Sequence, residues 1–294
     1  MSIRVVVASL AALVTAWPSD SMSALQAALS TTPRETRIQV GKASLYSREI
    51  GRGQPVVVLH GGPDFDHGYL LPDLDRLADA FRLIYYDQRG RGRSGVGVQP
   101  EEVTLTSDVD DLDEVRRHFQ LESSALLGHS WGTVLALEYA LRYPERVSRM
   151  ILMNPAPAST DDYKQLRKEW LEKRADDMDR RKAISASAAY KDGDPDAVTA
   201  YYRIHFKPAL ARPEDFEKVI ARLRSSFTKE GILKARAIES RLMNEHGHRP
   251  STTCSPSSRA LGSRRWSSMA TTSSSPPVRP RTLLRQCQMP TWLR

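Results

Sequence analysis

The chain has 294 residues, of which 40% are hydrophobic, and its 43 basic and 35 acidic side chains give a net charge of +8. This is enough to bury one full core with an insertion. Both cysteines, Cys254 and Cys287, lie near the C-terminus, which excludes a disulfide framework. Eight arginines in residues 246–294 account for the whole positive excess, so the rest of the chain is formally neutral. We therefore expect no nucleic-acid partner.

Residues 1–21 begin with an apolar run, Val5 to Trp17, that follows Arg4. The run is too short to cross a bilayer as a helix, so no membrane association is expected. One positive residue and the Trp17-Pro18 sequence fit a signal peptide poorly. We favour an N-terminal extension, with the domain starting at Met22, and a cytoplasmic protein. A signal peptide in residues 1–21, and hence export, is the alternative.

Strands and helices alternate through the next part of the chain. The alternating pattern around Gly41-Lys42 predicts an entry hairpin. Unbroken apolar strands separated by helical patterns predict a mostly parallel sheet covered by helices on both faces. The expected strands are 37–40, 43–46, 55–59, 81–86, 124–127 and 147–153, and the expected helices are 73–80, 104–119 and 133–141. Charged helical patterns follow at 163–182, 197–206, 213–224 and 232–243.

The most informative motif is Gly128-His129-Ser130-Trp131-Gly132, which lies between an apolar strand and a helical pattern. A Gly-x-Ser-x-Gly in this context is the nucleophile elbow of α/β-hydrolases. The turn is so tight that side chains at Gly128 and Gly132 would clash, and Ser130 is held at the carboxyl edge of the sheet. His129 is expected to be structural.

A second motif, His60-Gly61-Gly62-Pro63, directly follows the strand at 55–59. Acyl transfer requires N–H donors aimed at the oxygen on which negative charge develops. A glycine loop after an early strand supplies one donor, and the residue after the nucleophile supplies the other. We expect these donors at Gly62 and Trp131. The alternative is a plain glycine turn.

A third motif, Asp87-Gln88-Arg89-Gly90-Arg91-Gly92-Arg93-Ser94, follows the strand at 81–86. It lacks the Gly-Lys-Ser/Thr of a phosphate-binding loop, and no aromatic residues alternate with its arginines. We interpret it as a structural turn whose arginines pair with nearby carboxylates.

Together the three motifs resemble the proline iminopeptidase family of serine peptidases, over about residues 35–245. The resemblance implies an α/β-hydrolase fold with a helical cap, and removal of N-terminal residues from peptides. The family usually has Gly after His-Gly-Gly-Pro, where this chain has Asp64, so an esterase on the same fold is an alternative. Cap carboxylates hold the substrate amine in the family. Glu239 and Glu245 are possible counterparts, although a solvated salt-bridge role is favoured for both.

The resemblance divides the chain into segments. We expect an N-terminal extension (1–21), the N-terminal part of the hydrolase core (22–157), a helical cap with the return to the core (158–245), and an off-pattern, disordered tail (246–294). The tail is rich in Ser, Pro and Arg and contains no Asp, Glu or Lys. Its alternatives are a nucleic-acid-binding arm and a frameshift near Glu245. The frameshift is favoured, because the shifted codons of Trp266 to Thr271 permit Val-Ile-His-Gly-Asp, a late strand and an acid-bearing loop. The last strands of the sheet would then be missing, and the chain would be poorly soluble.

The expected function follows from Ser130 as the catalytic nucleophile, with no metal and no cofactor. The triad order of the fold is Ser, then Asp or Glu, then His. The acid and the base are not identified, and His246 and His248 lack a matching context. The expected activity is therefore an impaired serine aminopeptidase acting on a small peptide, amide or ester. A catalytically dead scaffold that acts as a binding protein is the alternative.

Overall fold

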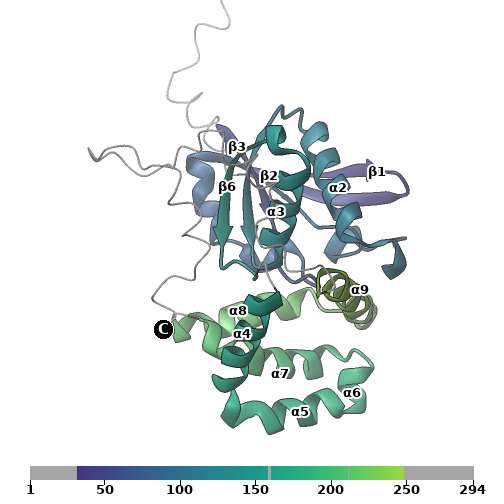
Figure 1. The fold of residues 1–294 in the computed structure, drawn as a ribbon, viewed down its shortest axis with the longest axis vertical. Helices are drawn as coiled ribbons and strands as arrows, with labels where there is room; N and C mark the ends of the chain where they lie inside the picture. Colours follow the sequence, from purple (N-terminus) through teal and green to yellow (C-terminus); the bar gives the residue numbers. More distant parts are fainter. Residues whose placement is uncertain (1–31, 158–159, 211, 248–294) are drawn as a thin grey trace, which may run out of the picture.

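The computed structural model describes residues 32–157, 160–210 and 212–247, which form a sheet domain and a group of helices beside it (Figure 1). The described residues end within the last helix, Lys229–Gly247. The expectations for residues 1–21 and for the tail after residue 247 lie outside the described residues.

The sheet has six strands in the order β1-β2-β4-β3-β5-β6. β1 and β2 form the predicted hairpin, and β2 also pairs antiparallel with β4. Among themselves, β4, β3, β5 and β6 pair parallel, which confirms the mostly parallel sheet. The strands are β1 (Arg34–Val40), β2 (Ala43–Ile50), β3 (Gln54–Leu59), β4 (Phe81–Tyr86), β5 (Ser124–His129) and β6 (Val147–Met153).

Alternate side chains of the central strands pack into two cores. Val57 and Ile84 face the core under α2 (Leu105–His118) and α3 (Trp131–Arg142). Val58 faces the second core, where Leu70 and Ala78 belong to two short 3-10 helices, His67–Leu70 and Leu74–Asp79. The helix predicted at 73–80 is therefore a 3-10 helix. Successive side chains of a strand point to opposite faces of the sheet. Because both faces are covered here, these strands are apolar throughout.

The outer strand β6 differs from the central strands. Among the described residues it pairs with β5 alone. Ile151 is 50% exposed and Leu152 is 39% exposed. An apolar edge strand of this kind is a template for association with another chain.

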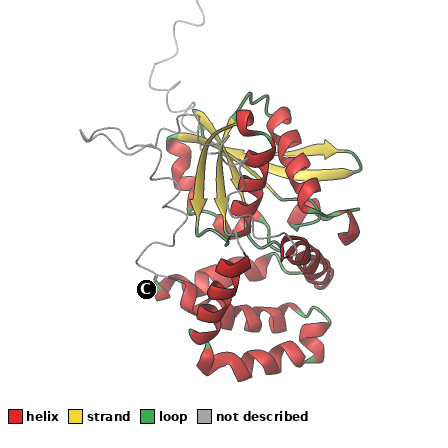
Figure 2. Ribbon diagram, in the orientation of Figure 1, coloured by secondary structure: helices red, strands yellow, loops and turns green. Residues whose placement is uncertain are grey.

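The segment after β6 is helical, and its helices gather below the carboxyl ends of the parallel strands (Figures 1 and 2). The short helix α6 (Ala188–Lys191) begins at a Ser187 cap, and α7 (Pro195–Phe206) begins at an Asp194 cap with Pro195 at its first position. The other helices are α4 (Thr160–Glu172), α5 (Met178–Ala186), α8 (Phe216–Ser225) and α9 (Lys229–Gly247). α9 returns to the sheet domain, where Ile238 and Leu242 join the core of α2 and α3.

Candidate active site

Ser130 occupies the turn between β5 and α3, with φ 50° and ψ −117°. A non-glycine residue at this positive φ is strained, and such strain is typical of functional turns. The Ser130 N–H donates to the Met153 carbonyl at 3.1 Å, which ties the turn to β6. Ser130 is only partly buried. The tight turn therefore leaves a serine side chain at the carboxyl edge of the sheet.

The glycines beside Ser130 are required by close backbone contacts. A Cβ at Gly128 would lie 2.5 Å from the Gly132 carbonyl oxygen. A Cβ at Gly132 would lie 2.2 Å from the Leu59 carbonyl oxygen, on the neighbouring strand β3. These distances confirm the predicted steric reason for both glycines. The contact at Gly132 also places the start of α3 against the end of β3.

The loop after β3 passes next to the serine. A Cβ at Gly61 would lie 2.9 Å from the Ser130 Cβ, so only a glycine lets the two segments approach this closely. His60 is fully buried, its Nδ1–H donates to the Gly61 carbonyl at 2.8 Å, and its Nε2 accepts from the Gln88 N–H at 3.0 Å. Burial lowers the pKa of His60 to about 3, which keeps the imidazole neutral and permits this pattern.

The orientation of the Gly62 N–H follows from these contacts. A trans peptide is planar, and its C=O and N–H point in opposite directions. Because the Gly61 carbonyl points to the buried His60 ring, the Gly62 N–H points away from that ring. Gly62 itself has φ 121°, which a side chain would strain. Trp131, the other expected donor, is the first residue of α3, where an N–H has no intrahelical partner.

A tyrosine joins the glycine loop to the elbow. The Gly61 N–H donates to the Tyr69 hydroxyl at 2.7 Å, and this hydroxyl lies 2.6 Å from Nδ1 of His129. Burial lowers the pKa of His129 to about 4, so its ring is neutral near neutral pH. With the ring proton on Nε2, Nδ1 accepts the Tyr69 proton. His129 thus has the structural setting expected of it. Sequence reasoning missed Tyr69, which lies in the short 3-10 helix His67–Leu70, a segment without periodicity or motif.

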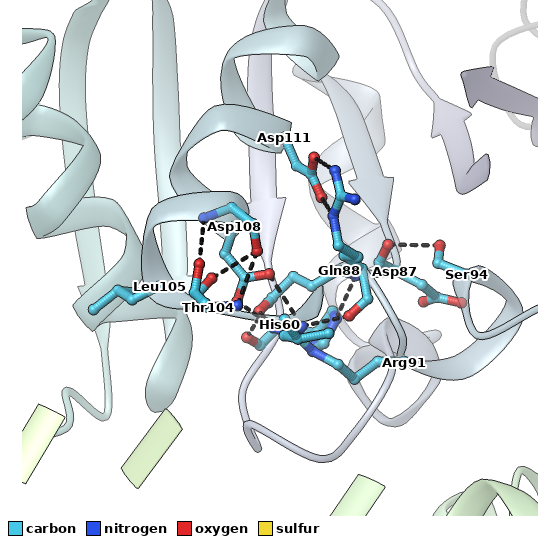
Figure 3. Close-up of polar contacts among 12 residues, drawn as sticks. His60, Asp87, Gln88, Arg91, Ser94, Thr104, Leu105, Asp108 and Asp111 are labelled. Carbon is cyan, nitrogen blue, oxygen red and sulfur yellow. Dashed lines mark hydrogen bonds and ion pairs between the residues drawn. The ribbon is translucent and has the colours of Figure 1, made fainter. Parts of the chain in front are cut away.

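Behind the glycine loop lies the third motif (Figure 3). The Gln88 side chain donates to the His60 carbonyl at 2.9 Å and accepts from Arg91 at 2.7 Å. Arg91 forms a two-pronged ion pair with Asp108, and both side chains have zero exposure. The other two arginines pair with Asp111 and Glu35. The interpretation as a structural turn is confirmed, and its role is to support His60.

The described residues do not bring an imidazole to Ser130: among them, no hydrogen bond joins a histidine to its hydroxyl. His67 pairs with Asp87 at 2.6 Å in a buried position. The His246 ring packs edge-on against the buried Trp131 ring, with 5.6 Å between ring centroids. His248 lies outside the described part of the chain.

Two carboxylates from different segments, Asp64 of the glycine loop and Glu239 of α9, lie close enough for the charge of one to act on the other. Asp64 accepts a hydrogen bond from the Tyr202 hydroxyl of α7 at 2.6 Å. Burial, and next the charge of Asp64, raise the pKa of Glu239 to about 8, against the opposing effect of Arg236. Burial likewise raises the pKa of Asp64. This partly buried setting of Glu239 differs from the solvated salt-bridge role that the sequence favoured for it.

Glu245 has a different environment. One of its carboxylate oxygens accepts from the Leu105 N–H at 3.0 Å, at the first residue of α2. A carboxylate at this end of a helix is stabilised by unpaired N–H groups and the helix dipole. Glu245 thus caps a helix, and this contact assigns it no part in an amine site.

Within residues 32–157, 160–210 and 212–247, no group of three or more His, Cys, Asp or Glu side chains could hold a metal ion. None of the helices in these ranges has the length and apolar character that a bilayer crossing requires.

The sheet order and the strand–turn–helix at Ser130 define an α/β-hydrolase fold. Residues 54–194 match the family model of the alpha/beta hydrolase fold. The proline iminopeptidase of Heyndrickxia coagulans is 40% identical over 119 residues, which cover 40% of this chain and 41% of that protein. The proline iminopeptidase of Saccharolobus solfataricus is 29% identical over 176 residues, covering 58% and 56%.

Among solved structures, a proline iminopeptidase-related protein from Thermus thermophilus has a TM-score of 0.50 and 25% identity, covering 73% of this chain and 72% of that one. The chain is an α/β-hydrolase-fold protein that resembles the proline iminopeptidases. It spans about two fifths to just over half of the length of the two curated relatives.

Proposed function

We propose that this chain is a serine hydrolase of the aminopeptidase type, in which Ser130 attacks the carbonyl carbon of the first peptide bond of a small peptide. The observation that carries the proposal is the strained position of Ser130 at the start of α3, directly beside Gly61. The N–H groups of Gly62 and Trp131 are the proposed donors to the oxyanion. Preorganised donors of this kind stabilise the charge that develops during acyl transfer.

The proton balance of the reaction needs a further group. As the bond from Ser130 Oγ to the carbonyl carbon forms, the hydroxyl proton passes to a general base, which later gives it to the departing amine. No imidazole contacts Ser130 among the residues described here. We therefore expect these residues alone to support only slow acylation, several orders of magnitude below a complete triad.

The carboxylate pair supports a substrate with a free amine. Asp64 belongs to the glycine loop beside Ser130, and Glu239 reaches it from α9. A protonated amine placed between these two partly buried carboxylates would neutralise their mutual repulsion. The names of the relatives, proline iminopeptidase, agree with an N-terminal amine as the group recognised.

A fluorophosphonate probe tests the serine directly, because only an activated hydroxyl reacts with it. We expect labelling at Ser130 that the Ser130→Ala variant abolishes. The absence of labelling in the intact chain would contradict the proposal and favour a binding protein on the same scaffold.

The substrate class needs a separate measurement. A prolyl chromogenic amide should be cleaved faster than a short-chain ester, and Glu239→Gln should raise the KM for the amide with little effect on the ester. Glu217→Gln is the matched control, because this exposed carboxylate pairs with Arg203 on the surface. Preference for the ester, unaffected by Glu239→Gln, would identify an esterase.

A further inference from the structure

We propose that Tyr69 is a positioning residue that fixes the oxyanion site by linking the glycine loop to the nucleophile elbow. The proposal deepens the serine hydrolase function proposed above, because it concerns the geometry of the same site. Tyr69 belongs to the 3-10 helix His67–Leu70, outside the three motifs.

The hydroxyl of Tyr69 has two partners on different segments. It accepts from the Gly61 N–H at 2.7 Å and lies 2.6 Å from Nδ1 of His129, to which it donates when that ring carries its proton on Nε2. A phenolic oxygen can do both at once, whereas phenylalanine can do neither. One atom therefore connects the loop after β3 with the residue before Ser130.

The two hydrogen bonds of Gly61 act together. Its N–H is held by Tyr69, and its C=O is held by His60. With both peptide groups of Gly61 fixed, the direction of the Gly62 N–H is also fixed, since that N–H lies in the same plane as the Gly61 carbonyl. His60 holds this plane through the Gly61 carbonyl, whereas Tyr69 holds the preceding peptide plane, to which the Gly61 N–H belongs.

The surroundings hold the ring of Tyr69 in place. Its ring lies 5.5 Å from that of His129 and 5.7 Å from that of Phe65, centroid to centroid. A Cβ at Gly61 would lie 2.8 Å from the Tyr69 oxygen, so the hydroxyl fits closely against the loop. Without the hydroxyl, the Gly61 N–H loses its acceptor, and an unpaired amide relaxes toward another partner.

The test compares Tyr69→Phe with Tyr85→Phe. Tyr85 is a matched control because its ring is buried on β4 and its hydroxyl donates to Asp75 at 3.0 Å, away from the elbow. In Tyr69→Phe we expect displaced NMR signals for the Gly61 and Gly62 amides and about tenfold faster exchange of the Gly61 amide. Tyr85→Phe should leave these signals in place. A merely structural tyrosine would lower the stability without moving them.

Labelling of Ser130 by the fluorophosphonate gives the functional readout. We expect Tyr69→Phe to slow labelling about tenfold or more, and Tyr85→Phe to change it less than about twofold. Unmoved Gly61 and Gly62 signals, or unchanged labelling despite moved signals, would overturn the proposal. If the wild-type chain does not label, the hydrolase function fails, and the amide signals alone decide the role of Tyr69.

A measurement on the wild-type chain keeps the proposal testable if Tyr69→Phe does not fold. The proposed direction of the bridge, from the Tyr69 hydroxyl to Nδ1 of His129 over 2.6 Å, requires that Nδ1 carry no proton. Imidazole ¹⁵N shifts should show the Nε2–H tautomer. A proton on Nδ1 would overturn the proposal.

Discussion

Gly132, at the second position of α3, lies directly against the backbone of Leu59 at the end of β3. A Cβ at Gly132 would be 2.2 Å from the Leu59 carbonyl oxygen and 2.8 Å from that of His60. Both atoms belong to the backbone and cannot rotate away, so this contact sets how closely the elbow approaches the glycine loop.

We expect Gly132→Ala to cost about 3 kcal/mol of the free energy of unfolding, at the upper end of the range for overpacked sites, since α3 must move. Urea denaturation measures this cost. Gly97→Ala is the matched control: Gly97 has φ 72° and a Cβ there would meet no atom within 4 Å, so backbone strain alone should cost about 1 kcal/mol. Equal costs for the two variants would contradict the role of the contact.

Ser130 provides a second test, of backbone strain. At φ 50° an alanine keeps the strain, whereas a glycine relieves it. The Ser130→Gly variant should therefore be about 1 kcal/mol more stable than Ser130→Ala, both measured by urea denaturation. An alanine variant as stable as the glycine variant would show that the turn is relaxed.

The ion pair between Arg91 and Asp108 is completely buried, in contrast to the exposed pair of Arg117 and Glu114. Arg91→Met should cost about 3–5 kcal/mol, because it leaves the Asp108 carboxylate buried without its partner. Glu114→Ala should cost less than about 1 kcal/mol. The double variant Arg91→Met/Asp108→Leu should be more stable than Arg91→Met alone, as thermal and urea unfolding can show. If the double variant loses as much free energy of unfolding as the two single variants together, this pair is not coupled.

The raised pKa of Glu239 predicts that the stability of the chain depends on pH. Its pKa is about 8 in the folded chain against 4.5 for an ordinary glutamate. A raised folded-state pKa contributes stability that is complete below pH 4.5 and is lost as the pH rises through about 8. Each pKa unit corresponds to about 1.4 kcal/mol.

The Glu239→Gln variant removes this titration. We therefore expect the stability of the wild type to fall relative to Glu239→Gln as the pH is raised from 4.5 to 8. Asp64→Asn should weaken the effect, because the charge of Asp64 also raises the pKa of Glu239. Parallel stability curves for the wild type and Glu239→Gln would refute the assignment.

The exposed side chains of β6 predict self-association. Ile151 is half exposed on a strand that pairs, among the described residues, with β5 alone. Ile151→Lys should reduce light scattering by concentrated protein and leave the free energy of unfolding nearly unchanged. Ser148→Lys, at another exposed position of β6, is the control. An equal reduction of light scattering by Ile151→Lys and Ser148→Lys would show that the added charge in general causes the effect.

Much of the sheet could be predicted from local patterns. The strand at 147–153 has the predicted bounds, and the Gly41-Lys42 turn joins β1 and β2 as expected. Apolar runs and turn residues report burial and chain reversal directly, because both are local properties. The segment 74–79 was harder, since a short 3-10 helix has no distinctive period.

At the site, the residue pattern alone was enough to identify Ser130 and the glycines around it, because a tight turn restricts which residues fit at each position. Which groups surround that turn is decided by the packing of segments that are distant in the sequence. Tyr69, Asp64 and Glu239 meet at the site from three segments, through contacts that no spacing along the chain encodes. Burial, which depends on every neighbouring segment at once, is what keeps His129 neutral and raises the pKa of Glu239.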